Sequence, residues 1–379
     1  MAPDKLFWNL DFGAWDFNFG IYFQLVFLPF FQYWLVNSHS VNGKSGLFLI
    51  FAANHSKDIM TGKDLRIVFM GTPDFAVASL KALVEGGYNI VGVITVPDKP
   101  AGRGRQLQQS AVKQYAVEQG LHVMQPEKLK NPEFLAELEA LKADLQVIVA
   151  FRMLPEVVWS MPRLGTFNLH GSLLPQYRGA APLNWAVMNG DKETGVTTFL
   201  LSHEIDTGAI LFHEKITIGE DDTVGDIHDR LMEIGAGLVV KTVDALAEGN
   251  YTAVAQDDIQ VESLRPAPKI FKEDCKIDWN KPAVEVRNLI RGLSPYPAAW
   301  TELVDGKGKV LSLKIFRAEI EPAEGLTPGM VETDGKTNFK IAAADGWLTI
   351  SDLQLSGKKR MAVDDFLRGI HDPGQLQVQ

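Results

Sequence analysis

Apolar and amphipathic stretches alternate along the chain from residue 65 onward, and their spacing predicts strands and helices in turn. The apolar runs are short and typical of strands buried in a parallel sheet; they span 65–71, 89–96, 122–124 and 144–151. Apolar residues at helical spacing predict the intervening helices at 73–85, 110–119 and 132–142. This alternation predicts a Rossmann-like, doubly wound α/β domain.

The pattern continues through a second group of elements up to residue 250. Strands are predicted at 164–170, 194–201 and 209–218, the last two as an antiparallel hairpin, with a short helix at 182–189. A long helix is predicted from 223 to 248, where Thr223 can cap the first turn and Gly249 ends the last. By the same reasoning, Thr72 can cap the first helix, with Pro73 at its first position.

The pattern changes after residue 250. Residues 251–268 are polar, with acidic positions at Asp257 and Asp258, and we expect a linker there. A helix is then predicted at 283–293, followed by short strands at 299–304, 310–320, 329–332, 339–343 and 347–355. Short strands separated by Gly and Asp turns predict a small β-barrel. We therefore expect an α/β domain at 64–250, a linker at 251–268 and a barrel domain at 269–379.

Residues 1–63 do not match this organisation and are not expected to be part of the fold. The segment is rich in aromatic residues, and no acidic or basic residue occurs between Asp16 and Lys44. Residues 20–36 are almost wholly apolar, but Pro29 interrupts a run that is near the lower length limit for crossing a bilayer. We interpret the segment as upstream sequence translated through a misplaced start, with Met60 near the true beginning. A membrane-anchoring segment is the second interpretation and a structured aromatic extension the third.

Composition excludes several classes of protein. The single cysteine, Cys275, excludes an intrachain disulfide and a cysteine-cluster metal site, and it suits a reducing cytoplasm. The net charge of −10 argues against broad, non-specific nucleic-acid binding, so DNA is not an expected partner. The turn that begins at Gly71 lacks the G-x-G-x-x-G spacing, which excludes dinucleotide binding at that position.

Candidate chemistry lies at the end of the strand predicted at 164–170. Side chains two apart on a strand point the same way, so Asn168 and His170 face together, roughly 6–7 Å apart along the chain. An amide beside an imidazole can bind and protonate a carbonyl oxygen that becomes negative during acyl transfer. Asp206 lies in a later turn and is a possible partner for the imidazole. An isolated histidine is more often structural, so the triplet alone leaves both interpretations open.

A second candidate is a basic loop after the second predicted strand. Residues 97–105 are too rich in Pro and Gly to predict a regular element. From 97 to 114 the basic residues Lys99, Arg103, Arg105 and Lys113 outnumber the single acidic residue, Asp98. One interpretation is a solvated, flexible loop, and the other is a mobile basic finger that contacts phosphates or a negatively charged substrate.

Several motifs, taken together, are specific to one family. The chain resembles the 10-formyltetrahydrofolate-dependent formyltransferases, and the branch acting on methionyl-tRNA in particular, from about residue 65 to the C-terminus. The motifs that carry the resemblance are Gly71-Thr-Pro-Asp-Phe75, Pro97-Asp-Lys-Pro-Ala-Gly-Arg-Gly104, Asn168-Leu-His-Gly-Ser-Leu-Leu-Pro175, Arg178-Gly-Ala-Ala-Pro182 and Asp206-Thr-Gly208. The sequence departs from the family pattern at Ala150-Phe-Arg152, which affects the expected wall of a pterin pocket.

The resemblance implies both an activity and a site. It implies formyl transfer from 10-formyltetrahydrofolate to the amine of methionyl-initiator tRNA, by a cytoplasmic monomer without a metal, and it implies that the C-terminal barrel is OB-like. The implied catalytic residues are Asn168, His170 and Asp206. The implied folate-binding residues are Ser172, Leu173, Leu174 and Pro175, and the implied tRNA-binding residues are Lys99, Arg103 and Arg105. The alternatives are formyl transfer to a sugar-nucleotide amine or another small amine, and a catalytically silent folate- or RNA-binding relative.

Overall fold

The computed structural model describes residues 36–41, 44–49, 60–101, 106–370 and 373–378, and the chain divides into two compact units, Met1–Ile59 and Met60–Gln379. In the first unit, β1 (Val36–Val41) and β2 (Lys44–Leu49) pair as antiparallel strands. The apolar run at 20–36 lies outside the described residues apart from its last position. Within the described ranges, no helix is both long and apolar enough to cross a membrane.

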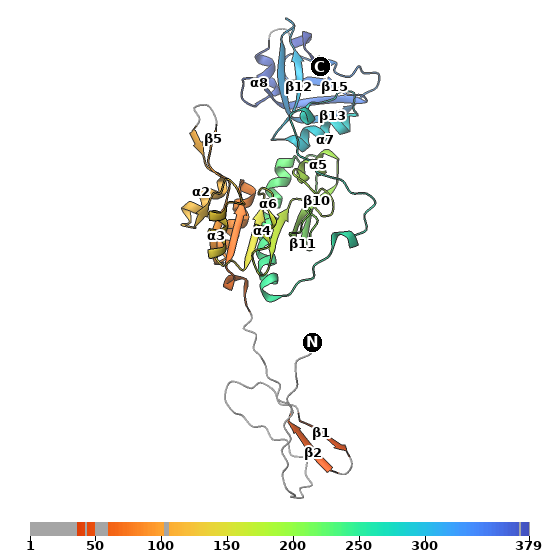
Figure 1. Ribbon diagram of the computed structural model, residues 1–379. Helices are drawn as coiled ribbons and strands as arrows, with labels where there is room; N and C mark the ends of the chain where they lie inside the picture. The colour runs from red at the N-terminus through yellow and green to blue at the C-terminus, as the bar shows by residue number, and fades with distance from the viewer. Residues whose placement is uncertain (1–35, 42–43, 50–59, 102–105, 371–372, 379) are drawn as a thin grey trace. The chain divides into compact units, whose positions relative to one another are not determined.

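A seven-stranded sheet forms the centre of the α/β part of the second unit (Figure 1). Its spatial order is β11 (Ile210–Thr217), β10 (Glu193–Leu200), β9 (Thr166–His170), β8 (Leu145–Val149), β3 (Ile67–Gly71), β4 (Ile90–Ile94) and β7 (Val123–Met124). The strands from β9 to β7 run parallel, whereas β10 pairs antiparallel with both β9 and β11. The predicted α/β fold and the predicted hairpin are therefore confirmed.

Helices pack on both faces of this sheet, so the central strands β3, β4 and β8 each contribute to two apolar cores. The larger core contains side chains of α1 (Asp74–Glu85), α2 (Ala111–Glu118), α5 (Pro182–Met188) and α6 (Val224–Glu248). The smaller core contains side chains of α3 (Pro132–Ala140) and α4 (Glu156–Trp159). On β8, Val147 belongs to the larger core and the next residue, Ile148, to the smaller one. Burial on both faces explains why these strands have nearly continuous apolar sequences.

The ends of the helices test the predicted caps. Thr223 accepts a hydrogen bond from the Asp226 amide at 3.3 Å, Asp226 accepts one from the Thr223 amide at 2.8 Å, and Gly249 follows α6 with a φ of 68°. Both predicted ends of this helix are confirmed. The Thr72 cap is wrong, because Pro73 has an extended ψ of 178° and is itself the cap residue, without a side-chain hydrogen bond.

The prediction that 97–105 is irregular is also wrong over part of its length. Short strands β5 (Lys99–Ala101) and β6 (Gln106–Gln108) pair antiparallel, and β5 stands out from the body of the domain (Figure 1). Backbone pairing needs no apolar periodicity, so composition alone could not show it. Arg103 and Arg105 lie outside the described residues.

The C-terminal part is an antiparallel β-barrel of the predicted OB-like kind around its own apolar core. Its sheet order is β14 (Val331–Thr333), β15 (Phe339–Ala342), β16 (Gly346–Leu355), β13 (Val310–Pro322), β12 (Ala299–Val304) and β18 (Gln377–Val378), with β17 (Met361–Ala362) paired to β16. The helices are α7 (Ala283–Leu293), which agrees with its predicted range, and α8 (Val363–Arg368), which the sequence analysis missed. Short 3₁₀ turns occur at Gly62–Asp64, Gln256–Asp258, Glu273–Cys275 and Pro373–Gln375.

Hydrogen bonds join the barrel to the α/β part. The Asn184 amide on α5 donates to the Gly292 carbonyl on α7 at 2.8 Å. The Arg291 guanidinium donates to the carbonyls of Gly219 and Asp222 at 3.2 and 3.1 Å. Burial lowers the pKa of Arg291, whose side chain nevertheless keeps these neutral oxygen partners. The two parts of this unit therefore meet through specific polar contacts around α7.

Residues 251–268 run back along the α/β part as irregular chain before entering the barrel (Figure 1). Val254 forms an isolated antiparallel bridge with Ile210, and Ala267 forms a parallel one with Gly179. The expected linker is thus held against the α/β part near both of its ends.

Candidate active site

Strand β9 ends with His170, whose imidazole is oriented by the turn that follows it. The side chain is 7% exposed, and its Nε2 donates to the Tyr177 carbonyl at 2.8 Å. A carbonyl oxygen only accepts, so Nε2 carries the hydrogen and a neutral ring has its lone pair on Nδ1. Nδ1 lies 3.9 Å from Oδ2 of Asp206. That separation is too long for a direct hydrogen bond. Both atoms can instead accept hydrogen bonds from one donor group placed between them.

Asn168 lies on the same side of β9 and is half-buried. Its position pairs in register with Phe199 on β10, and Phe199 packs edge-on against the His170 ring with centroids 6.4 Å apart. Phe199, Leu174 and Ile210 form a small apolar cluster here. The side-chain amide of Asn168 has no hydrogen-bond partner among the described residues. It is a free donor at the edge of an apolar surface.

Asp206 completes the predicted group from a different loop. Its φ of 56° is left-handed, which is uncommon for a residue other than glycine and is frequent at functional sites. Its Oδ2 accepts from the Gly179 amide at 3.0 Å, and its side chain is 14% exposed. Gly208 is required nearby, because a Cβ there would lie 1.6 Å from the Leu200 carbonyl oxygen. The structure thus places Asp206 beside His170, at 3.9 Å, and His170 shares one side of β9 with Asn168.

The turn 172–175 is buried apart from half-buried Leu173, and hydrogen bonds to Gln176 and Thr197 hold it. Ser172 donates from its hydroxyl to the Gln176 carbonyl at 2.6 Å, and its own carbonyl accepts from the Thr197 hydroxyl at 2.7 Å. The Leu174 amide donates to the same Thr197 oxygen at 3.2 Å. These contacts fix the direction in which the chain leaves β9, directly beside His170.

Tyr177, whose carbonyl binds His170, is itself held by Asp191 and Arg265. Burial raises its pKa to about 12, so the hydroxyl stays protonated and donates to Asp191 at 2.8 Å. Arg265 stacks over the ring at 4.7 Å and donates to both Asp191 oxygens at 2.6 and 2.9 Å. The Tyr177 amide donates to the Arg265 carbonyl at 2.7 Å. Segment 251–268 therefore contacts the residue that orients the imidazole.

The departure at Ala150-Phe-Arg152 has a clear structural role. Arg152 donates to the Glu127 carbonyl at 2.9 Å and to the Pro126 carbonyl, which joins the loop after β8 to the loop after β7. Its guanidinium lies 5.6 Å over the Phe151 ring, and burial lowers its pKa. Ala150 begins this loop with a φ of 47°.

The predicted basic loop has less uncompensated positive charge than its composition indicates. Lys113 donates to Asp98 at 2.6 Å, so these two charges compensate each other. That hydrogen bond is the main reason why the pKa of Asp98 is lowered. Lys99 is exposed on β5. Of the three predicted tRNA-binding residues, Lys99 alone is described.

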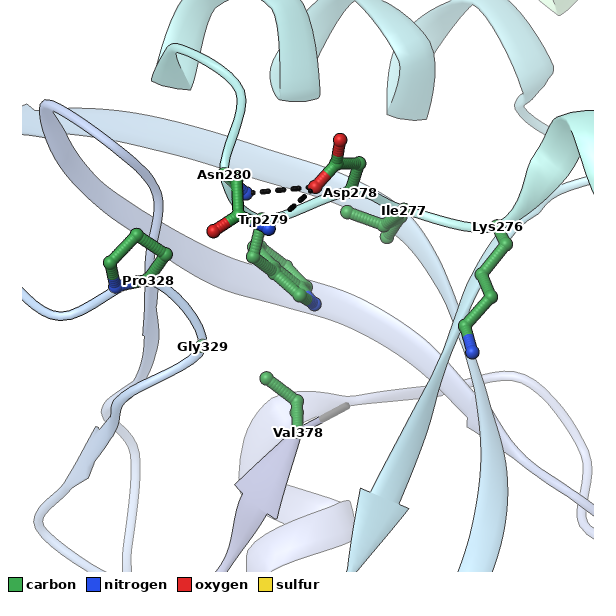
Figure 2. Close-up of a pocket in the computed structure, with 8 residues that line it drawn as sticks. All are labelled: Lys276, Ile277, Asp278, Trp279, Asn280, Pro328, Gly329 and Val378. Carbon is green, nitrogen blue, oxygen red and sulfur yellow. Dashed lines mark hydrogen bonds between the residues drawn. The ribbon is translucent and has the colours of Figure 1, made fainter.

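A separate hollow of about 440 Å³ lies in the barrel (Figure 2). Its polar lining includes Lys276, which pairs with Glu302 at 2.8 Å, and Asp278, which accepts from Asn280 at 2.9 and 3.0 Å. Lys276 and Glu302 compensate each other's charge, and Asp278 is occupied by hydrogen bonds from Asn280. Across the part of the chain that the structure describes, no three His, Cys, Asp or Glu side chains are grouped to hold a metal ion.

The sequence analysis missed the residues that hold this group together. These are Tyr177, which precedes the predicted Arg178 motif, Gly179, which lies within it, and Gln256 and Arg265, which lie in the expected linker. Gly179 has a φ of 127°, and a Cβ there would lie 2.4 Å from the Ala267 carbonyl oxygen. The glycine in the motif was a usable signal for a close backbone contact, whereas nothing local distinguished Gln256.

Comparison with known proteins shows the family of this chain. A family model described as formyl transferase matches residues 65–243, and one described as formyl transferase, C-terminal domain, matches residues 269–371. The methionyl-tRNA formyltransferase of Parabacteroides distasonis is 63% identical over 323 residues, covering 84% of this chain and 100% of the relative. That of Bacteroides fragilis is 60% identical over 314 residues, covering 82% of this chain and 97% of the relative.

Solved structures at lower identity share the fold. An N-formyltransferase from Helicobacter canadensis, solved with folinic acid and dTDP-3-aminofucose, has a TM-score of 0.55 at 22% identity and covers 78% of this chain and 100% of its own. HypX from Aquifex aeolicus, solved with tetrahydrofolic acid, has a TM-score of 0.54 at 19% identity and covers 81% of this chain and 48% of its own. The fold is thereby confirmed, and the family models and the closely similar relatives show that this chain belongs to the methionyl-tRNA formyltransferases of the formyl transferase family.

Proposed function

We propose that this protein transfers the formyl group of 10-formyltetrahydrofolate to the amino group of methionyl-initiator tRNA, as a monomer in the cytoplasm, for translation initiation. The observation that supports this most directly is the free Asn168 amide beside His170 and Asp206, in a chain 63% identical to a methionyl-tRNA formyltransferase. The three side chains supply a hydrogen-bond donor, a titratable ring and a carboxylate, which are the groups that acyl transfer between two nitrogens requires.

The first step is attack of the methionyl amine nitrogen on the formyl carbon. A new C–N bond forms, and the formyl oxygen becomes an oxyanion in the tetrahedral intermediate. Asn168 donates to this oxyanion from its side-chain amide, which no described residue occupies. Removal of one such donor commonly lowers the rate by ~10²–10³.

Proton transfer falls to His170 and Asp206. Because Nε2 is bound to the Tyr177 carbonyl, His170 reaches the reacting groups through Nδ1. Nδ1 and the Asp206 carboxylate, 3.9 Å apart, accept the proton that the attacking amine loses. When the bond from the formyl carbon to N10 of the folate breaks, protonated Nδ1 returns a proton to that nitrogen. The reaction consumes no water and needs no covalent enzyme intermediate.

We assign the folate to the side of the site next to turn 172–175. Ser172, Leu173, Leu174 and Pro175 line this side, and Leu173 is the half-buried member of the turn. A further apolar surface for a flat ring comes from Met153, Val157 and Ile205, which are 75%, 47% and 62% exposed. His203 lies 3.6 Å from Glu156 on α4, which brings the loop carrying Ile205 against the helix carrying Val157. We assign the tRNA acceptor end to Lys99, Arg103 and Arg105, following the family motif.

Transfer of a labelled formyl group from 10-formyltetrahydrofolate to methionyl-initiator tRNA tests the function. Free methionine and an amino-sugar nucleotide serve as competing acceptors in the same assay. We expect label in the tRNA and little in either competitor. Preferential labelling of the sugar nucleotide, or no transfer to any acceptor, would contradict the proposal.

A further inference from the structure

We propose that Gln256, in the segment between the two domains, is a positioning residue that sets the geometry of Asp206 for the reaction. This inference rests on the proposed function and adds to it a residue outside the predicted catalytic group. Gln256 is only 3% exposed although its neighbours Ala255 and Asp257 are exposed. A buried carboxamide in an otherwise solvated segment requires specific partners.

Every hydrogen-bonding position of the Gln256 side chain is occupied. Its Nε2 donates to the carbonyls of Asp206 and Gly208, both at 2.8 Å. Its Oε1 accepts from the Nε and Nη2 of Arg178 at 3.0 and 2.8 Å. Two carbonyls on one side and a guanidinium on the other permit one orientation of the amide. The side chain therefore connects the loop that carries Asp206 to the loop that carries Arg178.

These contacts close a ring around the Asp206 carboxylate. Arg178 precedes Gly179, whose amide donates to Asp206 Oδ2 at 3.0 Å. Gln256 binds the Asp206 backbone on one side and the Arg178 side chain on the other. Both the backbone and the carboxylate of Asp206 are thus fixed by groups whose relative position depends on Gln256.

The loop around Asp206 is largely exposed, and its other contacts are local: Thr207 donates to the Glu204 carbonyl at 3.1 Å, and His203 lies 3.6 Å from Glu156. His203, Glu204 and Ile205 are all exposed, and Asp206 has a left-handed φ of 56°. Gln256 is itself fixed from behind, because Val254 exchanges backbone hydrogen bonds with Ile210 at 2.8 and 2.9 Å. The rigid edge of β11 is therefore connected through Gln256 to the exposed loop, and through it to the 3.9 Å spacing between Asp206 and His170.

The test compares Gln256→Met with a matched control, Gln260→Met. Methionine has nearly the length of glutamine but none of its hydrogen bonds, and Gln260 is exposed, with no side-chain hydrogen bond to a described residue. We expect Gln256→Met to lower kcat for formyl transfer by about 10–100-fold, since small displacements of a reacting group have effects of that size. The KM values for both substrates should stay within about twofold, because uniform binding is not altered. Gln260→Met should match the wild type.

A double variant separates positioning from general folding. Asp206→Ala keeps the backbone carbonyl that Gln256 binds and removes the carboxylate that it positions. If Gln256 acts through that carboxylate, Asp206→Ala with Gln256→Met should be no slower than Asp206→Ala alone, within about twofold. If Gln256→Met lowers kcat in the Asp206→Ala background by as much as it does in the wild type, the positioning role is overturned.

The remaining outcomes are also decisive. Gln256→Asn keeps the amide one methylene shorter, and we expect a smaller loss of kcat; it replaces the methionine variant if that protein does not fold. If the wild type transfers formyl groups and both Gln256→Met and Gln256→Asn have the same kcat as the wild type, the positioning role alone is overturned. A wild type that transfers none would overturn the proposed function, and the positioning role with it.

Discussion

Strand β9 and segment 251–268 meet at the same site and are built in opposite ways. β9 is a central strand hydrogen-bonded to neighbours on both sides, and it presents Asn168 and His170 directly. Segment 251–268 has one 3₁₀ turn and two isolated bridges, and it reaches the site through side chains that bind backbone carbonyls and Asp191. Two of the three proposed reacting groups therefore lie on regular structure, whereas the position of the third, Asp206, depends in our proposal on irregular chain.

The largest expected effect comes from the reacting groups. Asn168→Ala, His170→Ala and Asp206→Ala should each lower kcat by at least ~10²-fold, the usual magnitude for removing a donor or proton-transfer group. His213→Ala on β11, an exposed histidine, serves as the matched control and should keep normal activity. Steady-state kinetics and circular dichroism measure rate and fold together. A variant with near-normal kcat would show that its residue has no catalytic role.

A smaller effect is expected from the supporting segment at Arg265. Arg265→Ala removes the stack over Tyr177 and both hydrogen bonds to Asp191, so the carbonyl that binds His170 is held less firmly. We expect kcat to fall about tenfold, as for other displacements of a reacting group. Arg265→Lys keeps the charge but has neither the paired hydrogen bonds to Asp191 nor the planar stack on Tyr177. It should therefore recover little of the lost kcat. Full recovery by lysine would mean that charge alone matters there.

The β5–β6 hairpin is a third region to compare with β9 and segment 251–268. Changes in it should affect substrate binding more than the spacing of the candidate site residues. Arg103→Ala should raise the KM for methionyl-tRNA about threefold, the magnitude of one exposed charge interaction, and also lower kcat. The KM for 10-formyltetrahydrofolate should hardly change, and tRNA binding should depend less steeply on salt. Lys142→Ala, an exposed lysine before β8, is the control. Equal changes in both KM values would place the hairpin in general folding.

The smallest effect is expected from the N-terminal segment. None of the residues assigned to the site lies in 1–59, and the Parabacteroides distasonis relative aligns over its full length with 84% of this chain. A protein that begins at Met60 should keep normal kcat and both KM values in the same assay. Loss of activity or folding would show that this segment supports the site as well.

The two regions also differ in how far the sequence predicts them. Periodicity, caps and turn residues are local, and they predicted β9, α6 and α7 within about two residues. The group Asn168, His170 and Asp206 was recognised because its motifs are contiguous. Gln256 gave no such signal, since its partners lie 48, 50 and 78 positions away and a lone polar residue in a polar segment has no periodicity. Pro73 shows where local signals fail, because Thr72 and Pro73 are both residues that can begin a helix and the sequence does not decide between them.

The bridge between Ala267 and Gly179 ties the end of segment 251–268 to the α/β domain. For function, the segment therefore belongs with that domain. A chain cut after Gly249 would retain Asn168, His170 and Asp206, and yet it would lack both Gln256 and Arg265. Cutting after Pro268 instead would keep those supports with the α/β domain and separate only the barrel. The two truncated proteins would carry the same catalytic residues, and only the longer one would hold them at a working distance.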